Sequence, residues 1–103
     1  MQFFEETTEF ERDEYNDVKN WTKHGLTQKE IEQAFFGFKI IFPDGKHSAI
    51  EERYCLIGNT DGSKVLFIAY TSRRLKIRVI SARPASRLER LIYEKTSKKY
   101  SKI

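Results

Sequence analysis

With 103 residues, the chain can form one domain around a single modest core, to which eight Phe and five Tyr can contribute. One cysteine excludes an internal disulfide, two histidines without a Cys-x-x-Cys pair argue against a zinc site, and no apolar run suits a secretory signal or a membrane span, so we expect a cytoplasmic protein without metal or cofactor. Residues 64–103 hold twelve Lys and Arg against two Asp and Glu, whereas residues 1–63 hold seven against thirteen, and this division of a net charge of +4 favours a polyanion such as nucleic acid as partner of the C-terminal part.

The first predicted elements are a short strand near Thr8 to Glu11 and a helix that follows it. Asp13 is a suitable N-cap for this helix, and Gly25 can adopt the left-handed conformation that commonly ends one. His24 lies in the last turn, where the helix dipole favours a cation. A structural cap therefore explains His24 more simply than catalysis does.

An apolar stripe is expected on this first helix. Tyr15, Val18 and Trp21 recur at the spacing of one helix face, which predicts that they pack against the core. Trp21 could alternatively stack on a nucleobase, since aromatic side chains commonly bind single-stranded RNA in this way.

A second, shorter helix is predicted directly afterwards. Thr27 and Glu30 have the spacing of a capping box, in which each side chain accepts a hydrogen bond from the other residue's backbone amide. Ile31 and Phe35 then share one helix face, and Gly37 ends the pattern.

Four strands and their turns are predicted in the middle of the chain. Pro43-Asp44-Gly45 and Asp61-Gly62 are strong turn signals. The run from Val65 to Ala69 is continuously apolar, which predicts a central strand covered on both faces. The four strands are expected at Phe38–Phe42, Glu51–Gly58, Lys64–Thr71 and Leu75–Ala82.

The chain is predicted to end in a third helix and a basic tail. Ser86 and Glu89 have capping-box spacing, and Leu88, Leu91 and Ile92 share one stripe. We expect residues 1–95 to form a single domain and residues 96–103 a basic, flexible tail. The predicted fold class is α+β, with an antiparallel sheet of four to five strands, two N-terminal helices and one C-terminal helix.

Three groups of residues are distinctive in their order and spacing. They are Lys23-His24-Gly25, the link from Asp44 to Arg53 with its His47-Ser48 and Glu51-Glu52-Arg53, and Arg78-Val79-Ile80-Ser81-Ala82-Arg83 followed by Ala85, Glu89-Arg90 and Tyr93. Together they resemble the BrnT family of toxins from bacterial type II toxin–antitoxin modules, from about Phe10 to Glu94. The resemblance implies a RelE-like ribonuclease fold, RNA cleavage that arrests translation and neutralisation by a BrnA-type antitoxin. It also implies contact with DNA only through that antitoxin, and no contact with membranes.

RNA can be cleaved without a metal ion when its own 2′-hydroxyl attacks the adjacent phosphorus. The reaction needs a base for the hydroxyl, cationic donors for the phosphoryl oxygens and an acid for the leaving oxygen, and general acid–base help alone is worth roughly 10²–10⁴-fold. Arg, Lys, His and Glu side chains can supply all three. On this basis the candidate catalytic residues are Arg78, Arg83, His47, Lys23 and Glu52, and the candidate RNA-binding residues are Arg53, Lys76, Arg73, Arg74, Tyr70 and Trp21.

These assignments have structural alternatives. Arg78 could cap a solvated sheet face by pairing with a nearby glutamate, and Arg83 could tie the strand end to the last helix by bonding carbonyl groups. His47 could be a solvated loop residue, and Glu52 with Arg53 could form a simple cross-strand ion pair. For the whole chain, the alternative is a non-catalytic homologue of the same fold that binds nucleic acid or a partner protein.

Overall fold

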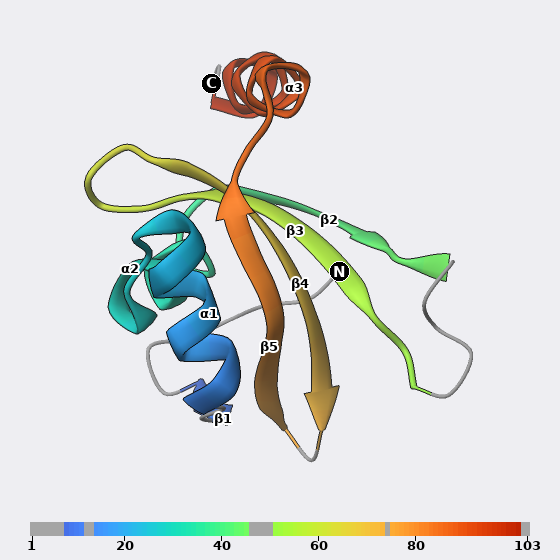
Figure 1. The fold of residues 1–103 in the computed structure, drawn as a ribbon. Helices are drawn as coiled ribbons and strands as arrows, with labels where there is room; N and C mark the ends of the chain where they lie inside the picture. The colour runs from blue at the N-terminus through green and yellow to red at the C-terminus, as the bar shows by residue number, and fades with distance from the viewer. Residues whose placement is uncertain (1–7, 12–13, 46–50, 74, 102–103) are drawn as a thin grey trace.

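The computed structural model describes residues 8–11, 14–45, 51–73 and 75–101 (Figure 1). In chain order their elements are β1 (Glu9–Glu11), α1 (Glu14–His24), α2 (Gln28–Gln33), β2 (Lys39–Pro43), β3 (Tyr54–Asn59), β4 (Val65–Arg73), β5 (Lys76–Pro84) and α3 (Arg87–Ser101). The predicted α+β class, with two N-terminal helices and one C-terminal helix, is confirmed. Among these described helices, none is both long enough and apolar enough to cross a membrane.

The strands form one sheet in the order β1-β5-β4-β3-β2. Strands β2 to β5 pair antiparallel with their neighbours in the chain, as the turn signals predict. Strand β1 instead pairs parallel to β5, with Glu9 beside Lys76 and Glu11 beside Arg78. The long connection between β1 and β5 permits this parallel pairing. The sheet is therefore mixed, although it is mostly antiparallel.

The hydrophobic core lies between one face of the sheet and the segment around α2. Phe35 is fully buried just after α2 and makes edge-to-face contacts with Phe10 and Tyr70, at centroid distances of 5.1 and 5.2 Å. This segment approaches β3 closely because Gly58 has no side chain, and a Cβ there would overlap the carbonyl oxygen of Ala34. The buried cluster comprises Leu26, Ile31, Ala34, Phe35, Leu56, Leu66, Ile68, Tyr70, Ile77, Val79 and Ala82.

Helix α1 packs on β5 through polar side chains. The Asn16 amide donates to the carbonyl of Val79, and the Asn20 side-chain carbonyl accepts from the backbone amide of Ala82, each at 3.3 Å. Because β1 pairs with β5 only as far as Arg78, these two side chains satisfy backbone groups on the continuation of that strand edge.

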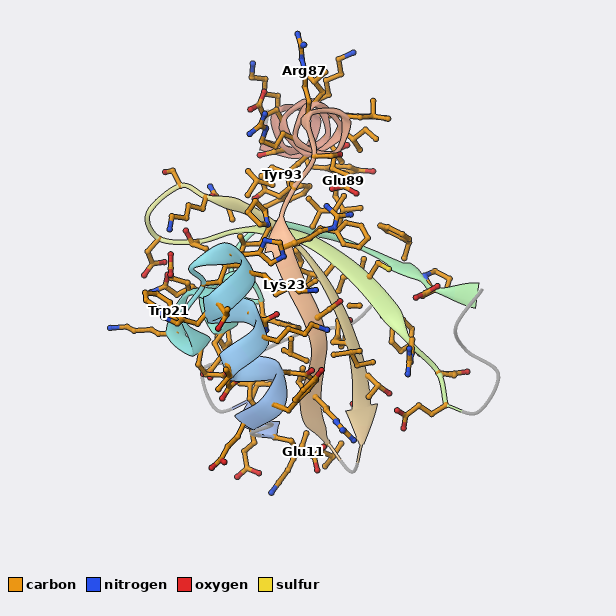
Figure 2. All side chains as sticks on the ribbon, viewed as in Figure 1. Glu11, Trp21, Lys23, Arg87, Glu89 and Tyr93 are labelled. Carbon is orange, nitrogen blue, oxygen red and sulfur yellow. The ribbon has the colours of Figure 1, made fainter. Side chains whose placement is uncertain are left out.

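The apolar stripe of α1 consequently faces solvent. Tyr15, Val18 and Trp21 are 76, 64 and 61% exposed, and Figure 2 shows Trp21 on the outer side of the helix. The prediction that these residues pack on the core, including the core alternative for Trp21, is therefore wrong. Hydrogen bonds from two asparagines to a strand edge, rather than burial of the apolar stripe, fix the rotation of α1 about its axis.

Helix α3 lies across one end of the sheet (Figure 1). The Tyr93 hydroxyl donates to the carbonyl of Phe38 at 2.9 Å, and Tyr93 and Tyr100 both pack on the Phe38 ring, at centroid distances of 5.7 and 6.2 Å. The helix continues to Ser101, so it includes most of the segment predicted as a basic tail. The contact of Tyr100 with Phe38 explains why the last turns stay helical. The domain boundary at residue 95 stays a prediction.

Candidate functional site

Two arginines of β5 share the sheet face that points away from the core. Arg78 pairs across the strands with Thr71, and Arg83 pairs with Phe67. Both partners are residues of β4 that alternate with the core positions of that strand, so they point to the opposite side. We call this side the arginine face and define it by Arg78, Arg83, Thr71 and Phe67.

A β-bulge places both arginines on the arginine face. Arg78 and Arg83 are five residues apart, so a regular strand would put them on opposite faces of the sheet. The pairing register shifts between Ala69 and Tyr70, which leaves Ile80 as an extra residue in β5. The extra residue brings both arginines to one face, about 13 Å apart, since their partners Phe67 and Thr71 are four residues apart on β4 at roughly 3.3 Å per residue.

The guanidinium of Arg83 is held by the first turn of α3 (Figure 2). Its Nη1 and Nη2 donate to the two carboxylate oxygens of Glu89 at 2.8 and 3.0 Å, and Nη1 also donates to the carbonyl of Pro84. The Glu89 carboxylate also accepts from the backbone amide of Ser86, which confirms the predicted capping box. The bidentate contact lowers the pKa of Glu89 and raises the pKa of Arg83. Arg83 thus ties the strand end to the helix, with a carboxylate as its main partner.

Aromatic rings lie beside Arg83 on the arginine face. The guanidinium carbon of Arg83 is 4.3 Å from the ring centroid of Phe67, whose ring is 6.1 Å from that of Phe42. Phe42 is 39% exposed. Neither phenylalanine is among the predicted site residues, because the continuous apolar run of residues 65–69 predicts a strand buried on both faces. The alternation of Phe67 with Leu66 and Ile68 is the signal that could have separated the two faces.

Glu11 of β1 and the backbone of Glu52, just before β3, lie near Arg78 at the opposite end of the arginine face. Glu11 of β1 is its neighbour in the parallel pairing, and Glu11 Oε2 is buried with no hydrogen-bond partner among the described residues. Thr71, on the other side of Arg78, donates to the backbone carbonyl of Glu52 at 2.7 Å. The Glu52 carboxylate accepts from the Tyr54 hydroxyl at 2.7 Å, and this contact raises the pKa of Tyr54. The structure therefore places only the backbone of Glu52 near Arg78, because the Glu52 carboxylate bonds Tyr54, whose ring packs on the core face. Glu11, which was not among the predicted site residues, is the neighbour of Arg78.

The two aromatic residues predicted to bind RNA lie elsewhere. Tyr70 is fully buried and stacks on Tyr54 at a centroid distance of 5.6 Å, and burial raises its pKa. A buried ring cannot stack on RNA, so the prediction for Tyr70 is wrong; its position in β4 faces the core beside Phe35. Trp21 is exposed, but it projects from α1 on the side away from Glu89 (Figure 2).

Two predicted cations flank the arginine face. Lys76 forms an exposed ion pair with Glu9 at 3.6 Å. Lys23 is exposed in the last turn of α1, and because Asn20 bonds Ala82 of β5, Lys23 lies alongside the end of β5 that also carries Arg83 (Figure 2).

Of the remaining predicted residues, only Arg53 has a side chain that the structure describes. Arg53 is half-buried just before β3, and its carbonyl accepts from the amide of Asp44 at 2.8 Å. His47, Arg74 and the side chain of Arg73 lie outside the described residues. In the part of the chain that the structure describes, no three His, Cys, Asp or Glu side chains gather in an arrangement that could hold a metal ion.

A cationic sheet face flanked by aromatic rings is characteristic of small domains that bind single-stranded nucleic acid. A family model described as the ribonuclease toxin BrnT of type II toxin–antitoxin systems matches residues 13–89. This match covers most of the chain and includes both arginines and Glu89, so the chain belongs to the BrnT family. Membership implies RNA as substrate and an antitoxin as protein partner. A search of curated proteins found no match.

Proposed function

We propose that this chain is a metal-independent endoribonuclease that cuts RNA by attack of the 2′-hydroxyl on the adjacent phosphorus. The observation that carries the proposal is the bulge in β5, because it brings Arg78 and Arg83 onto one sheet face beside an exposed aromatic ring. We further propose that the protein acts in the cytoplasm, arrests translation, is neutralised by a BrnA-type antitoxin and contacts DNA only through that antitoxin.

In the proposed reaction, the 2′-oxygen forms a bond to phosphorus and the bond from phosphorus to the 5′-oxygen breaks. A base takes the proton of the 2′-hydroxyl and an acid gives a proton to the leaving 5′-oxygen, which yields a 2′,3′-cyclic phosphate and a 5′-hydroxyl. We assign Arg78 to the phosphoryl oxygens, because a guanidinium on a strand presents two aimed donors. Glu52 stays a predicted base, although its carboxylate bonds the Tyr54 hydroxyl, whereas Glu11 pairs beside Arg78. His47 and Lys23 stay predicted acid–base groups.

Arg83 is given a different role from Arg78. Its ion pair with Glu89 offsets its charge, which makes it a weaker phosphate ligand, although its side chain is 43% exposed. Its stacking on Phe67, next to Phe42, suits the binding of a base of a neighbouring nucleotide. The separation of about 13 Å along the sheet supports two separate roles for the two arginines.

The test of this function is cleavage of a defined RNA oligonucleotide by the purified chain and its Arg78→Ala variant. We expect Arg78→Ala to lower the cleavage rate by at least about 100-fold, because one preorganised donor to a developing charge is worth 10²–10³. Lys29→Ala is the matched control, since Lys29 is an exposed cation on α2, on the other side of the sheet. If Arg78→Ala retains full activity while it is folded, the assignment of Arg78 is wrong.

The second candidate function is a non-catalytic homologue that binds nucleic acid or a partner protein. The observation that favours it is the occupation of Arg83 donors by Glu89, which reduces the cationic character of the face. High-level expression of the chain alone without any effect on growth, together with no cleavage of RNA by the purified chain, would support this candidate.

A further inference from the structure

Among the described residues, those in contact with helix α3 all lie on one side of it. Glu89 and Tyr93 point toward the sheet, whereas Arg87 projects away from it (Figure 2). The exposed side carries large aliphatic residues: Leu88, Leu91 and Ile92 are 67, 46 and 45% exposed. Because these three residues follow the spacing i, i+3 and i+4, they form one continuous apolar stripe on the helix.

Cations continue this stripe along the helix. Lys95 lies seven residues after Leu88, and Lys99 lies seven residues after Ile92, so both occupy the same side of α3. We call this side the outer face of α3 and define it by Leu88, Leu91, Ile92, Lys95 and Lys99. Its first half is apolar and its second half is positively charged.

We propose that the outer face of α3 is the docking surface for an acidic, amphipathic segment of the antitoxin. The inference rests on the proposed function in that it takes an antitoxin as the partner, but it does not depend on how RNA is cut. Aliphatic residues of the partner bury Leu88, Leu91 and Ile92, and its carboxylates meet Lys95 and Lys99.

The composition of the outer face disfavours two other occupants. Helix α3 holds five Lys and Arg against two Glu, and Glu89 is already bound to Arg83, so a second copy of α3 would set cations against cations. RNA would pair with the lysines, but it would leave the aliphatic stripe exposed, because bases stack on flat aromatic or guanidinium surfaces rather than on Leu and Ile. An acidic amphipathic protein segment complements both halves.

The apolar stripe of α1 does not show the same complementarity. Tyr15, Val18 and Trp21 are also exposed, but α1 has acids in its first turn and basic residues in its last turn. Because α1 carries charges of both signs, its stripe does not favour a partner of either charge. The stripe of α1 therefore provides a matched control, since it offers a comparable apolar surface on a different helix.

Docking on α3 places the partner next to the arginine face. The Arg83–Glu89 ion pair joins the end of β5 to the first turn of α3, one residue from Leu88. A segment bound along the outer face therefore starts one residue along the helix from Glu89, the partner of Arg83. At this position, one antitoxin segment can bind the toxin and also limit the approach of RNA to the arginine face.

The experiment measures, by calorimetry, the affinity of the full-length chain for a purified BrnA-type antitoxin protein. We expect Leu91→Glu to weaken binding at least tenfold, and the double variant Lys95→Glu with Lys99→Glu to weaken it and reduce its dependence on salt. Val18→Glu, the control on α1, should bind like the parent chain. All variants alter exposed positions, and circular dichroism verifies that each is folded.

Several outcomes would overturn the inference. Unchanged affinity of Leu91→Glu and of the lysine double variant for the antitoxin would exclude the outer face as the docking site. Loss of that affinity in Val18→Glu alone would place the docking site on α1. A fall in the mass of the toxin alone from dimer to monomer in Leu91→Glu would identify a second copy as the occupant. Weaker RNA binding without weaker antitoxin binding would identify RNA.

The inference and the proposed function can fail independently. A parent chain that cleaves RNA but does not bind the antitoxin through α3 would contradict only the docking surface. A parent chain that binds the antitoxin through α3 but leaves RNA intact would contradict only the ribonuclease assignment.

Discussion

Glu89 combines two contacts in one carboxylate. It accepts from the amide of Ser86 at the start of α3, and it pairs with both terminal nitrogens of Arg83. The first contact was predictable, because a capping box is a pattern of four consecutive residues. The second was only partly predictable: the sequence suggested that Arg83 ties strand to helix, but the choice of Glu89 as partner depends on the turn between β5 and α3.

We expect Glu89→Gln to destabilise the fold by about 1 kcal/mol at pH 7, a modest value because the ion pair is partly exposed to solvent. The pKa of Glu89 is lowered in the folded chain from its ordinary value of 4.5, so ionised Glu89 stabilises the fold above that value and the contribution is lost as the pH falls below it. The difference between parent and variant should therefore shrink toward pH 3.

Urea unfolding at pH 7 and at pH 3 measures this difference. Glu94→Gln is the matched control, because Glu94 is an exposed glutamate of the same helix. An equal loss of stability at both pH values, or an equal effect of Glu94→Gln, would contradict the role given to the Arg83–Glu89 pair.

At the scale of helices and strands, local sequence signals predict where an element begins and ends, whereas contacts between elements determine its orientation. Capping boxes and Gly25, which has φ of 64°, predicted where the helices begin and end within a few residues. The rotation of α1 and the bulge at Ile80 were not predicted, because both depend on which strand lies alongside. Asn16 and Asn20 look like ordinary polar positions until the short length of β1 is known.

We expect Gly58→Ala to lower stability by about 1–3 kcal/mol, because the added Cβ overlaps the carbonyl of Ala34 and forces the α2 segment away from β3. Thermal unfolding measures the change, at roughly 4–8 °C per kcal/mol for a domain of this size. Gly62→Ala is the control, since a Cβ at Gly62 meets its nearest neighbour, Thr60 Oγ1, at an ordinary 3.8 Å. A larger loss in Gly62→Ala than in Gly58→Ala would contradict the close packing of the α2 segment on β3.

For the whole molecule, the charge division along the sequence has a spatial counterpart. The basic C-terminal part supplies the strand with both arginines and the cationic side of α3, whereas β1 and α1 contribute acids at the edge of the sheet. The fold class and the family could be predicted because composition, turn signals and motif order draw on residues along the entire chain. The parallel pairing of β1 could not, since three residues carry too little pattern to specify a partner strand.

Cleavage by the parent chain should persist in excess EDTA and should leave fragments that end in a 2′,3′-cyclic phosphate. The expected reaction uses only protein side chains and the 2′-hydroxyl, so removal of divalent cations should not change the rate. Mass spectrometry of the fragments and a rate comparison with and without chelator measure this. Loss of activity in EDTA that Mg²⁺ restores, or fragments with a 3′-hydroxyl, would assign a different reaction class.

The amides of Asn16 and Asn20 have a consequence for how the chain behaves at high concentration. A sheet margin with unsatisfied backbone groups is a template on which a neighbouring molecule can add a strand. In this fold two side chains of α1 occupy such groups where β1 stops. The helix thereby protects against intermolecular strand addition along that margin, a safeguard that a longer β1 would otherwise supply.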